Sequence, residues 1–180
     1  MTTLDTIAPA TPADAPAVAA IYAHHVLNGV ASYETVPPSA DEMRARMVRV
    51  LDAGWPWLVA RDRAGEVLGY AYAAQFRDRP AYRYACEDSI YVAAERRGQG
   101  FGTALLLALI EAATRAGFRQ MIAVIGSADP ASAALHARHG FSEAGMMRAT
   151  GRKHGRWLDT LYMQRALGEG AAAPPPEEPG

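Results

Sequence analysis

Glycines at positions 98, 100 and 102 are the feature that most restricts how this chain can fold. They belong to the run Arg97, Gly98, Gln99, Gly100, Phe101 and Gly102. The run follows an apolar segment typical of a strand, residues 84–92, and precedes a strong helix former, residues 103–117. Glycine lets backbone N–H groups approach a ligand, and the start of a helix adds a positive end. The run therefore predicts either a tight turn or a strand–loop–helix unit that binds a phosphate or pyrophosphate.

Two common phosphate-binding motifs do not fit the glycine run. A dinucleotide fingerprint needs G-x-G-x-x-G after the first strand of a βαβ unit, and the spacing here differs. A P-loop needs a lysine, but Thr103 follows Gly102. The run is thus a local anion site of another kind.

Composition excludes several other classes of function. With 18 basic and 19 acidic residues among 180, the formal net charge is -1, which argues against nucleic acid as a partner. Cys86 is the single cysteine, so an internal disulfide and a cysteine-rich zinc site are excluded and a reducing compartment is compatible. The sequence shows neither a leader peptide at its start nor an apolar run of membrane length, and we expect a cytoplasmic protein without a membrane partner.

The pattern along the chain predicts one mixed α/β domain over residues 1–167. Residues 168–180 are rich in glycine, proline and acid, which predicts a disordered tail. Capping residues and apolar periodicity predict helices over 12–28, 39–54, 103–117 and 130–139. Alternating or apolar runs predict strands over 55–61, 66–75, 84–92, 120–125, 141–148 and 157–164, the first two forming a hairpin.

The glycine run matches the Q/R-x-x-G-x-G/A pyrophosphate loop of the GNAT acetyltransferases, and residues 7–167 resemble that family. Four further segments resemble its phosphinothricin and methionine sulfoximine N-acetyltransferase branch: IYAHHVLNGVASYET, GYAYAAQFRDRPAYRYACEDSIYV, ASAALHARHGF and GRKHGRWLDTLYMQRAL. The resemblance implies a central, mostly antiparallel, splayed sheet flanked by helices. It also implies direct acetyl transfer from acetyl-CoA to the amine of a small amino-acid-like substrate, by a homodimer.

The resemblance assigns the acetyl-CoA contacts to three segments. In the family, the strand before the loop offers its backbone to the pantetheine arm, a role that falls here on Ile90, Tyr91 and Val92, and the N–H of Val92 would stabilise the thioester oxyanion. The pyrophosphate falls to Arg97, Gly98, Gln99, Gly100, Phe101, Gly102 and Thr103. Asp129 stands where the family usually has an asparagine, so it either contacts CoA or caps the helix that starts at Pro130.

Two residues are candidates for proton transfer. An aliphatic amine is largely protonated near neutral pH, so a base or a water relay is required. By resemblance the base is Glu87; an isolated acid on a strand would otherwise suggest a solvated or ion-paired residue. Asp88, its neighbour, should point to the opposite face of the strand. His136 stands where many relatives place a leaving-thiolate donor, although a helix histidine is more often packed or solvated.

Residues for the acceptor come from the segment around Asp78. Arginine suits a carboxylate-bearing acceptor because its planar guanidinium donates two parallel hydrogen bonds. By resemblance, Arg77 and Arg83 bind the acceptor, Tyr33 and Tyr82 wall the pocket, and Glu87 faces it. His136 and His139 are three apart, but without a nearby cysteine or an H-E-x-x-H pattern we expect no metal. Cys86 is expected to pack as a small apolar residue and not to act as a nucleophile.

Two other functions remain open on the sequence alone. One is acetylation of peptide or protein amines, which would need an open groove in place of a closed pocket. The other is an acyl-CoA-binding sensor without catalytic activity.

Overall fold

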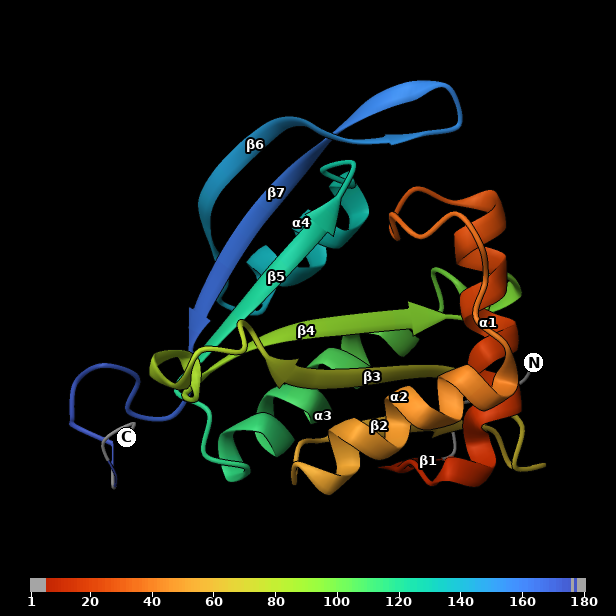
Figure 1. Cartoon of the computed structure of the whole chain (residues 1–180). Helices are drawn as coiled ribbons and strands as arrows, with labels where there is room; N and C mark the ends of the chain where they lie inside the picture. The colour runs from red at the N-terminus through yellow and green to blue at the C-terminus, as the bar shows by residue number, and fades with distance from the viewer. Residues whose placement is uncertain (1–5, 176, 178–180) are drawn as a thin grey trace.

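Strands from all parts of the chain pair into one sheet with the order β1-β2-β3-β4-β5-β7-β6 (Figure 1). The structure is a computed structural model that describes residues 6–175 and 177. Its strands are β1 (Thr6–Pro9), β2 (Trp57–Arg61), β3 (Val67–Gln75), β4 (Ala85–Val92), β5 (Gln120–Gly126), β6 (Ser142–Lys153) and β7 (Arg156–Ala166). Its helices are α1 (Ala15–Asn28), α2 (Ala40–Asp52), α3 (Phe101–Arg115) and α4 (Pro130–Arg138), with short 3₁₀ turns at Pro12–Asp14, Pro80–Tyr82 and Ala94–Arg96.

The sheet is antiparallel except where β4 meets β5. These two strands run parallel and pair only from Ala85 opposite Gln120 to Asp88 opposite Ala123. Beyond that point they separate, and Figure 1 shows them as the two arms of a wedge. The predicted splayed, mostly antiparallel sheet is therefore confirmed.

Helices cover both faces of the sheet and enclose two apolar cores. α1 and α2 lie on the face seen in front in Figure 1, where Trp57, Val59 and Tyr70 join the core. α3 lies behind and packs Leu105 and Leu109 against the other face. Alternation of side chains along β2 and β3 supplies both cores from the same strands.

Most predicted boundaries agree with the structure, and the differences have local causes. The first helix, predicted over 12–28, begins as a 3₁₀ turn at Pro12–Asp14, where Asp14 accepts a hydrogen bond from the Thr11 backbone N–H at 2.9 Å. α3 begins at Phe101, inside the glycine run, because Gly100 adopts a left-handed φ of 87° as its N-cap.

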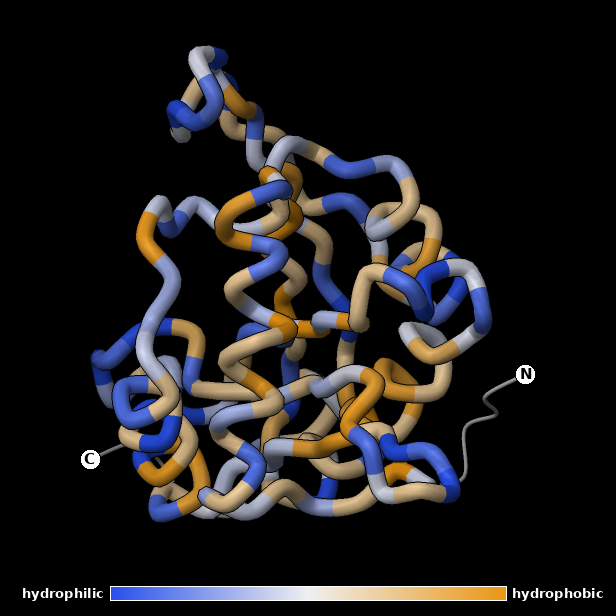
Figure 2. Tube along the Cα trace, turned by 90° about the vertical axis from the view of Figure 1, so that its right-hand side faces the viewer, coloured by the Kyte–Doolittle hydropathy of each residue, from blue (hydrophilic) through white to orange (hydrophobic). Residues whose placement is uncertain are grey.

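The last two strands are longer than predicted because they continue into a hairpin with a polar tip. Figure 2 colours this tip, at the top of the view, mostly blue. Its residues alternate too weakly between apolar and polar types to predict a strand.

A loop between α1 and α2 closes the wide end of the wedge. The Tyr33 ring of this loop packs where a Cβ on Gly151 would lie, 2.5 Å from the nearest ring carbon. A Cβ on Gly126 would meet the Ala31 carbonyl oxygen at 2.7 Å. Glycine at both positions thus lets the loop lie directly on β5 and β6.

The described part of the predicted tail contacts the domain. The Tyr84 hydroxyl donates to the Glu177 carbonyl, and Arg119 pairs with Glu169 at 3.3 Å. Disorder of residues 168–180 stays a prediction, and residues 1–5 of the predicted domain and 176 and 178–180 of the tail lie outside the described residues.

Candidate active site

The parting of β4 and β5 opens a cavity of about 770 Å³ that passes through the sheet. The last six residues of β4, Glu87 to Val92, and the last four of β5, Ala123 to Gly126, form its two long walls. The loop with Tyr33 and the first turns of α3 and α4 complete it. Because side chains alternate along β4, the cavity reaches the α1 face and the α4 face of the sheet at the same point.

The glycine run forms the end of the cavity on the α3 side. Arg97, Gly98, Phe101 and Gly102 line it. Gly98 has a φ of 73° and Gly100 one of 87°, a backbone region that side chains other than glycine rarely adopt. The run therefore turns the chain sharply and delivers the N-terminus of a 15-residue helix to the cavity. Free N–H groups and the helix dipole favour an anion there.

His25, on α1, connects this glycine run to the end of β4. Its Nε2 lies 2.9 Å from the Val92 carbonyl oxygen, which accepts, and its Nδ1 lies 3.2 Å from a guanidinium nitrogen of Arg97, which donates. These two partners fix a neutral imidazole protonated on Nε2. Burial lowers the pKa of His25 and the charge of Arg97 lowers it further, against the opposing effect of the Val92 hydrogen bond.

Glu87 has the environment of a base. Burial raises the pKa of its carboxyl and the neighbouring charge of Asp88 raises it further, while Arg77 opposes the shift. A carboxylate with a raised pKa accepts a proton more readily than an exposed one. Glu87 lines the cavity and is only partly exposed.

Asp88 and His136 form a buried pair on the opposite side of β4. Nε2 of His136 lies 3.0 Å from Oδ2 of Asp88, and Nδ1 lies 2.8 Å from the Ser132 carbonyl oxygen. Burial by itself lowers the pKa of His136, but the hydrogen bond and charge of Asp88 outweigh it, so the pKa is raised. The prediction that Asp88 points away from the face of Glu87 agrees with its contact to α4.

Known proteins match most of this chain. Residues 21–141 match the acetyltransferase (GNAT) family. The phosphinothricin N-acetyltransferase of Alcaligenes faecalis is 54% identical over 158 residues, which are 87% of this chain and 80% of that protein. This chain belongs to the GNAT acetyltransferase family.

Two further comparisons agree with this assignment. The L-methionine sulfoximine/L-methionine sulfone acetyltransferase of Pseudomonas paraeruginosa is 42% identical over 162 residues, 90% of this chain and 94% of that protein. The crystal structure of a GNAT superfamily phosphinothricin acetyltransferase from Sinorhizobium meliloti, in complex with AcCoA, superposes with a TM-score of 0.95. That chain is 54% identical, and the match covers 97% of this chain and 95% of the other.

Residues expected from the GNAT resemblance are only partly gathered at the cavity. The cavity lining includes these expected residues: Tyr33, Glu87, Ile90, Tyr91, Val92, Arg97, Gly98, Phe101, Gly102, Asp129 and His136. Gln99 donates its side-chain amide to the Glu95 carbonyl at 3.0 Å, and Gly100 and Thr103 contribute the turn and the first helical turn behind the lining. Asp129 caps α4 by accepting from the Ser132 N–H at 2.8 Å, as one of its two predicted roles required.

Three expected acceptor residues lie outside the lining. The Arg77 guanidinium stacks 3.9 Å from the centre of the Phe76 ring. Tyr82 contacts the edge of that same ring. Arg83 points toward the tail, where it pairs with Glu177 at 3.7 Å.

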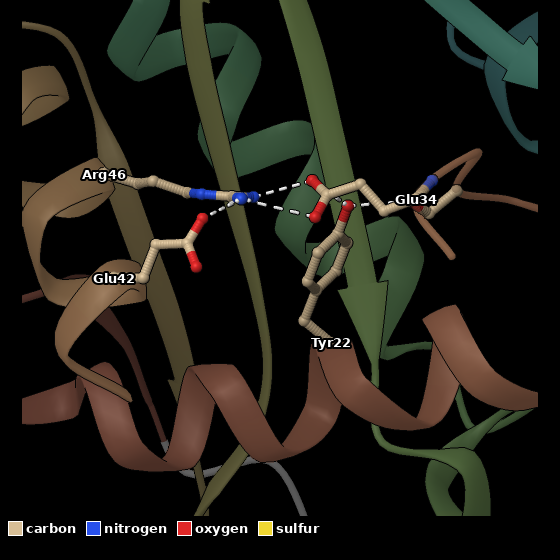
Figure 3. Close-up of polar contacts among 5 residues, drawn as sticks. Tyr22, Glu34, Glu42 and Arg46 are labelled. Atoms are coloured by element: carbon tan, nitrogen blue, oxygen red, sulfur yellow. Dashed lines mark hydrogen bonds and ion pairs between the residues drawn. The ribbon is translucent and has the colours of Figure 1, made fainter. Parts of the chain in front are cut away.

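A second polar group beside the cavity had no signal in the sequence. Glu34, in the loop between α1 and α2, receives both terminal nitrogens of Arg46 at 2.7 and 3.3 Å (Figure 3). Arg46 also pairs with Glu42 at 2.6 Å, and the Tyr22 hydroxyl donates to Glu34 at 3.0 Å. The group fixes the loop that carries Tyr33, and only the tertiary fold brings its members together.

Neither a membrane span nor a metal cluster is found in the part of the chain that the structure describes. Its helices are too short or too polar to cross a bilayer. Among residues 6–175 and 177, His, Cys, Asp and Glu side chains do not gather in threes in a way that would hold a metal ion. Cys86 is fully buried, as its predicted packing role requires, and burial raises the pKa of its thiol.

We predict that replacing His25 makes stability less sensitive to acid. An imidazole with a lowered pKa contributes stability above its unfolded pKa of about 6.5, and that contribution is lost as the pH falls toward the folded value. The difference in unfolding free energy between wild type and His25→Gln should therefore shrink between about pH 7.5 and pH 5. Urea unfolding at several pH values measures it, with His24→Gln as the control for removing an imidazole from the same helix. A difference in unfolding free energy that stays constant with pH would contradict a neutral His25 held between Val92 and Arg97.

Proposed function

We propose that this GNAT protein transfers the acetyl group of acetyl-CoA to the amine of a small amino-acid-like acceptor, by direct attack within a ternary complex. One observation carries the proposal. A single cavity crosses the sheet, with the anion-binding glycine run on one side and a carboxyl of raised pKa, Glu87, on the other. Donor and acceptor would meet where β4 and β5 part.

The donor side fits acetyl-CoA. Its pyrophosphate would lie at the N-terminus of α3, and its pantetheine arm would run along Ile90, Tyr91 and Val92, where β4 no longer pairs with β5. The relative from Sinorhizobium meliloti is crystallised with AcCoA and shares the fold closely. Val92 is tied to α1 through His25, which fixes the strand end whose N–H would stabilise the oxyanion.

The acceptor side supplies a base. An amino acid enters as an ammonium, R–NH₃⁺, and leaves as an amide. Two protons therefore leave nitrogen as the N–C bond forms and the C–S bond breaks; one ends on sulfur and one in solvent. Glu87, directly or through a water, would take the first proton. Holding both substrates in one site makes a covalent enzyme intermediate unnecessary.

The relatives support the class of acceptor. Two of them are named for phosphinothricin and for methionine sulfoximine or sulfone, which are amino-acid-like compounds. Arg77 would supply the carboxylate contact, since its charge already acts on Glu87. Arg83 is the weaker candidate because its guanidinium is turned to Glu177.

An assay of CoA release separates this function from its rivals. The panel contains phosphinothricin, methionine sulfoximine, methionine sulfone, the ordinary amino acids and short peptides, with the acetylated product identified by mass spectrometry. Rapid turnover of the free amino-acid-like compounds supports the proposal. Turnover of peptides alone would favour a protein acetyltransferase, and tight acetyl-CoA binding without turnover of any amine would favour a sensor.

The proposal also covers the cellular compartment and the oligomeric state of the protein. We place the protein in the cytoplasm, since a single buried cysteine suits a reducing compartment. We also propose a homodimer, in which the β6–β7 hairpin, with Trp157 63% exposed, contributes to the contact. Light scattering of the purified chain tests the dimer.

We predict that Glu87→Gln lowers kcat at neutral pH by about 10²- to 10⁴-fold, the usual contribution of a positioned base. The variant keeps the size of the side chain and loses its basicity, so acetyl-CoA should still bind. Raising the pH should partly restore the rate because free amine then forms without the enzyme. The pH profile of kcat/KM for both proteins is the measurement; identical profiles would leave Glu87 a structural carboxylate.

We predict that Arg77→Ala raises the acceptor KM about tenfold or more and leaves acetyl-CoA affinity unchanged. A carboxylate contact acts on the ground state and transition state alike, so its loss appears in KM. Arg83→Ala is the matched control: it removes the same group from the same loop, at a position that faces the tail. Steady-state kinetics with both substrates varied gives the KM of each substrate for each variant and tests the assignment. An effect confined to acetyl-CoA, or an equal effect of both variants, would contradict the assignment.

A further inference from the structure

A second, smaller cavity lies between the sheet and the two N-terminal helices, beside the candidate active site. It has a volume of about 260 Å³, and its walls come from α1, α2, β2, β3 and the loop between the two helices. We call it the side pocket. Its lining includes Tyr22, Glu34, Arg46, Trp57, Tyr70 and Tyr72. Tyr22 and Tyr72 line the larger cavity as well, so the two cavities adjoin at these two residues.

The side pocket lies on the same face of the sheet as Glu87. Trp57 of β2 lies opposite Tyr72 of β3, and Tyr72 lies opposite Ser89 of β4. Residues that lie opposite one another in an antiparallel pair share a face, and so do residues two apart on one strand. Burial raises the pKa of the Tyr72 hydroxyl, and the nearby charge of Glu87 adds to that shift. An acceptor whose amine lies at Glu87 can thus direct its side chain toward the side pocket.

Stacked rings and one ion pair give the side pocket fixed walls. The Trp57 ring stacks on Tyr72 with centroids 4.2 Å apart and on Tyr70 with centroids 5.9 Å apart. On the helix side, Arg46 reaches from α2 to the carboxylate of Glu34, which it binds at 2.7 and 3.3 Å (Figure 3). These contacts hold the walls in place before a substrate enters, which lowers the entropy cost of binding.

The indole N–H of Trp57 is a buried donor without an acceptor. Trp57 is 2% exposed, and its Nε1 has no hydrogen-bond partner among residues 6–175 and 177. An indole N–H can only donate, and buried donors are nearly always bonded. Since Trp57 lines the side pocket, the missing acceptor atom would belong to a molecule inside it. The pocket has room for water or for the end of a substrate, and either can supply that atom.

The charges of the lining select the kind of group that can enter the side pocket. Two guanidinium groups, Arg46 and Arg49, line it together with one carboxylate, Glu34. Arg46 is held by Glu34 and by Glu42, whereas Arg49 is exposed and has no ion pair among the described residues. A positive excess disfavours an ammonium and favours oxygen atoms that carry partial or full negative charge. The amine of the acceptor therefore stays at Glu87, and the far end of its side chain is the part that suits the pocket.

We propose that the side pocket receives the end of the acceptor's side chain and that the indole N–H of Trp57 donates a hydrogen bond to an oxygen there. The inference rests on the proposed acetyl transfer and names a feature of its acceptor. Sulfone, sulfoximine and phosphinate groups carry such an oxygen at the end of a short side chain. An acceptor without the oxygen leaves the buried N–H unpaired, and a site built to hydrogen-bond its substrate rejects such an analogue. Trp57 thus determines specificity and takes no part in proton transfer.

Two substrates that differ only in side-chain oxygen test the proposal. Methionine sulfone is methionine with oxygens added to its sulfur, and the wild-type protein should prefer the sulfone in kcat/KM. Trp57→Phe keeps an aromatic ring beside Tyr72 and removes the N–H. The preference should therefore fall at least tenfold, with little change in kcat/KM for methionine or in the KM for acetyl-CoA. Trp55→Phe is the matched control, since Trp55 contacts Phe118 and lies outside the lining of the side pocket. An unchanged preference in a folded Trp57→Phe overturns the proposal.

Nuclear magnetic resonance tests the contact without turnover. In ¹⁵N-labelled protein saturated with CoA, which carries no acetyl group, each of the three tryptophans gives an indole N–H signal. The Trp57 signal is assigned by its loss in Trp57→Phe or, if that variant fails to fold, by exclusion with Trp55→Phe and Trp157→Phe. Saturating methionine sulfone should shift the Trp57 signal by more than methionine does. A Trp57 signal that moves equally with both compounds, or with neither, overturns the proposal and leaves water as the partner of the indole.

The two measurements separate this inference from the proposed function. If no amine releases CoA, the acetyltransferase proposal fails, and the indole signal still shows whether the side pocket binds the sulfone. If CoA is released and both proteins prefer the sulfone equally, the transfer stands and the role of Trp57 is wrong.

Discussion

The parallel pairing of β4 with β5 ends after four residues, and the rest of the site depends on that limit. Backbone groups beyond Asp88 and Ala123 have no partner across the gap, and buried backbone groups need partners. On β4, the Val92 carbonyl is satisfied by His25 from α1. On the far arm, β5 keeps its antiparallel pairing with β7 through Gly126, so the arm stays rigid as it diverges. The cavity is thus a gap between two well-paired strands, which a substrate backbone or thioester can bridge.

Charged side chains near this gap are held in pairs, which explains how a chain with a net charge of -1 keeps several of them buried. Removing one partner of a buried pair costs about 3–5 kcal/mol, because the other charge stays without compensation. Asp88 and His136 form such a buried pair, whereas the side chains of Arg46 and Glu34 are 29% and 37% exposed and their pair is partly screened by solvent. His25 differs from both, since it meets a guanidinium and must stay neutral. Burial acts to lower the pKa of both histidines; the Arg97 charge lowers that of His25 further, while the contact with Asp88 raises that of His136.

Much of this structure follows from local sequence, and the remainder depends on contacts between distant segments. The helix caps at Ser39 and Asp129 are three-residue signals, and both predicted helices begin where those signals place them. The glycine run in the sequence predicted a loop at residues 97–102 and a helix directly after it, which is α3. The hairpin tip at 149–156 was missed because most of its residues are polar, as the colours of Figure 2 show, and give no alternating pattern. His25 had no local signal, since its partners Val92 and Arg97 lie about 70 residues away and only the packing of α1 on β4 joins them. The acceptor contact of Arg83, which the resemblance implied, stays a prediction; its pair with Glu177 likewise joins distant segments and had no local signal.

Adjacent carboxylates on one strand illustrate how the fold separates chemical roles. Glu87 and Asp88 are neighbours in sequence, and on an exposed loop they would titrate as two similar acids. On β4 their side chains leave opposite faces of the sheet. Glu87 meets no cation in direct contact in the described part of the chain, so burial raises the pKa of its carboxyl and makes it basic. Asp88 lies 3.0 Å from Nε2 of His136, and this contact raises the pKa of the imidazole against the effect of burial. Because both residues line the cavity, the two faces of a single strand present carboxyl groups with different surroundings to the same space.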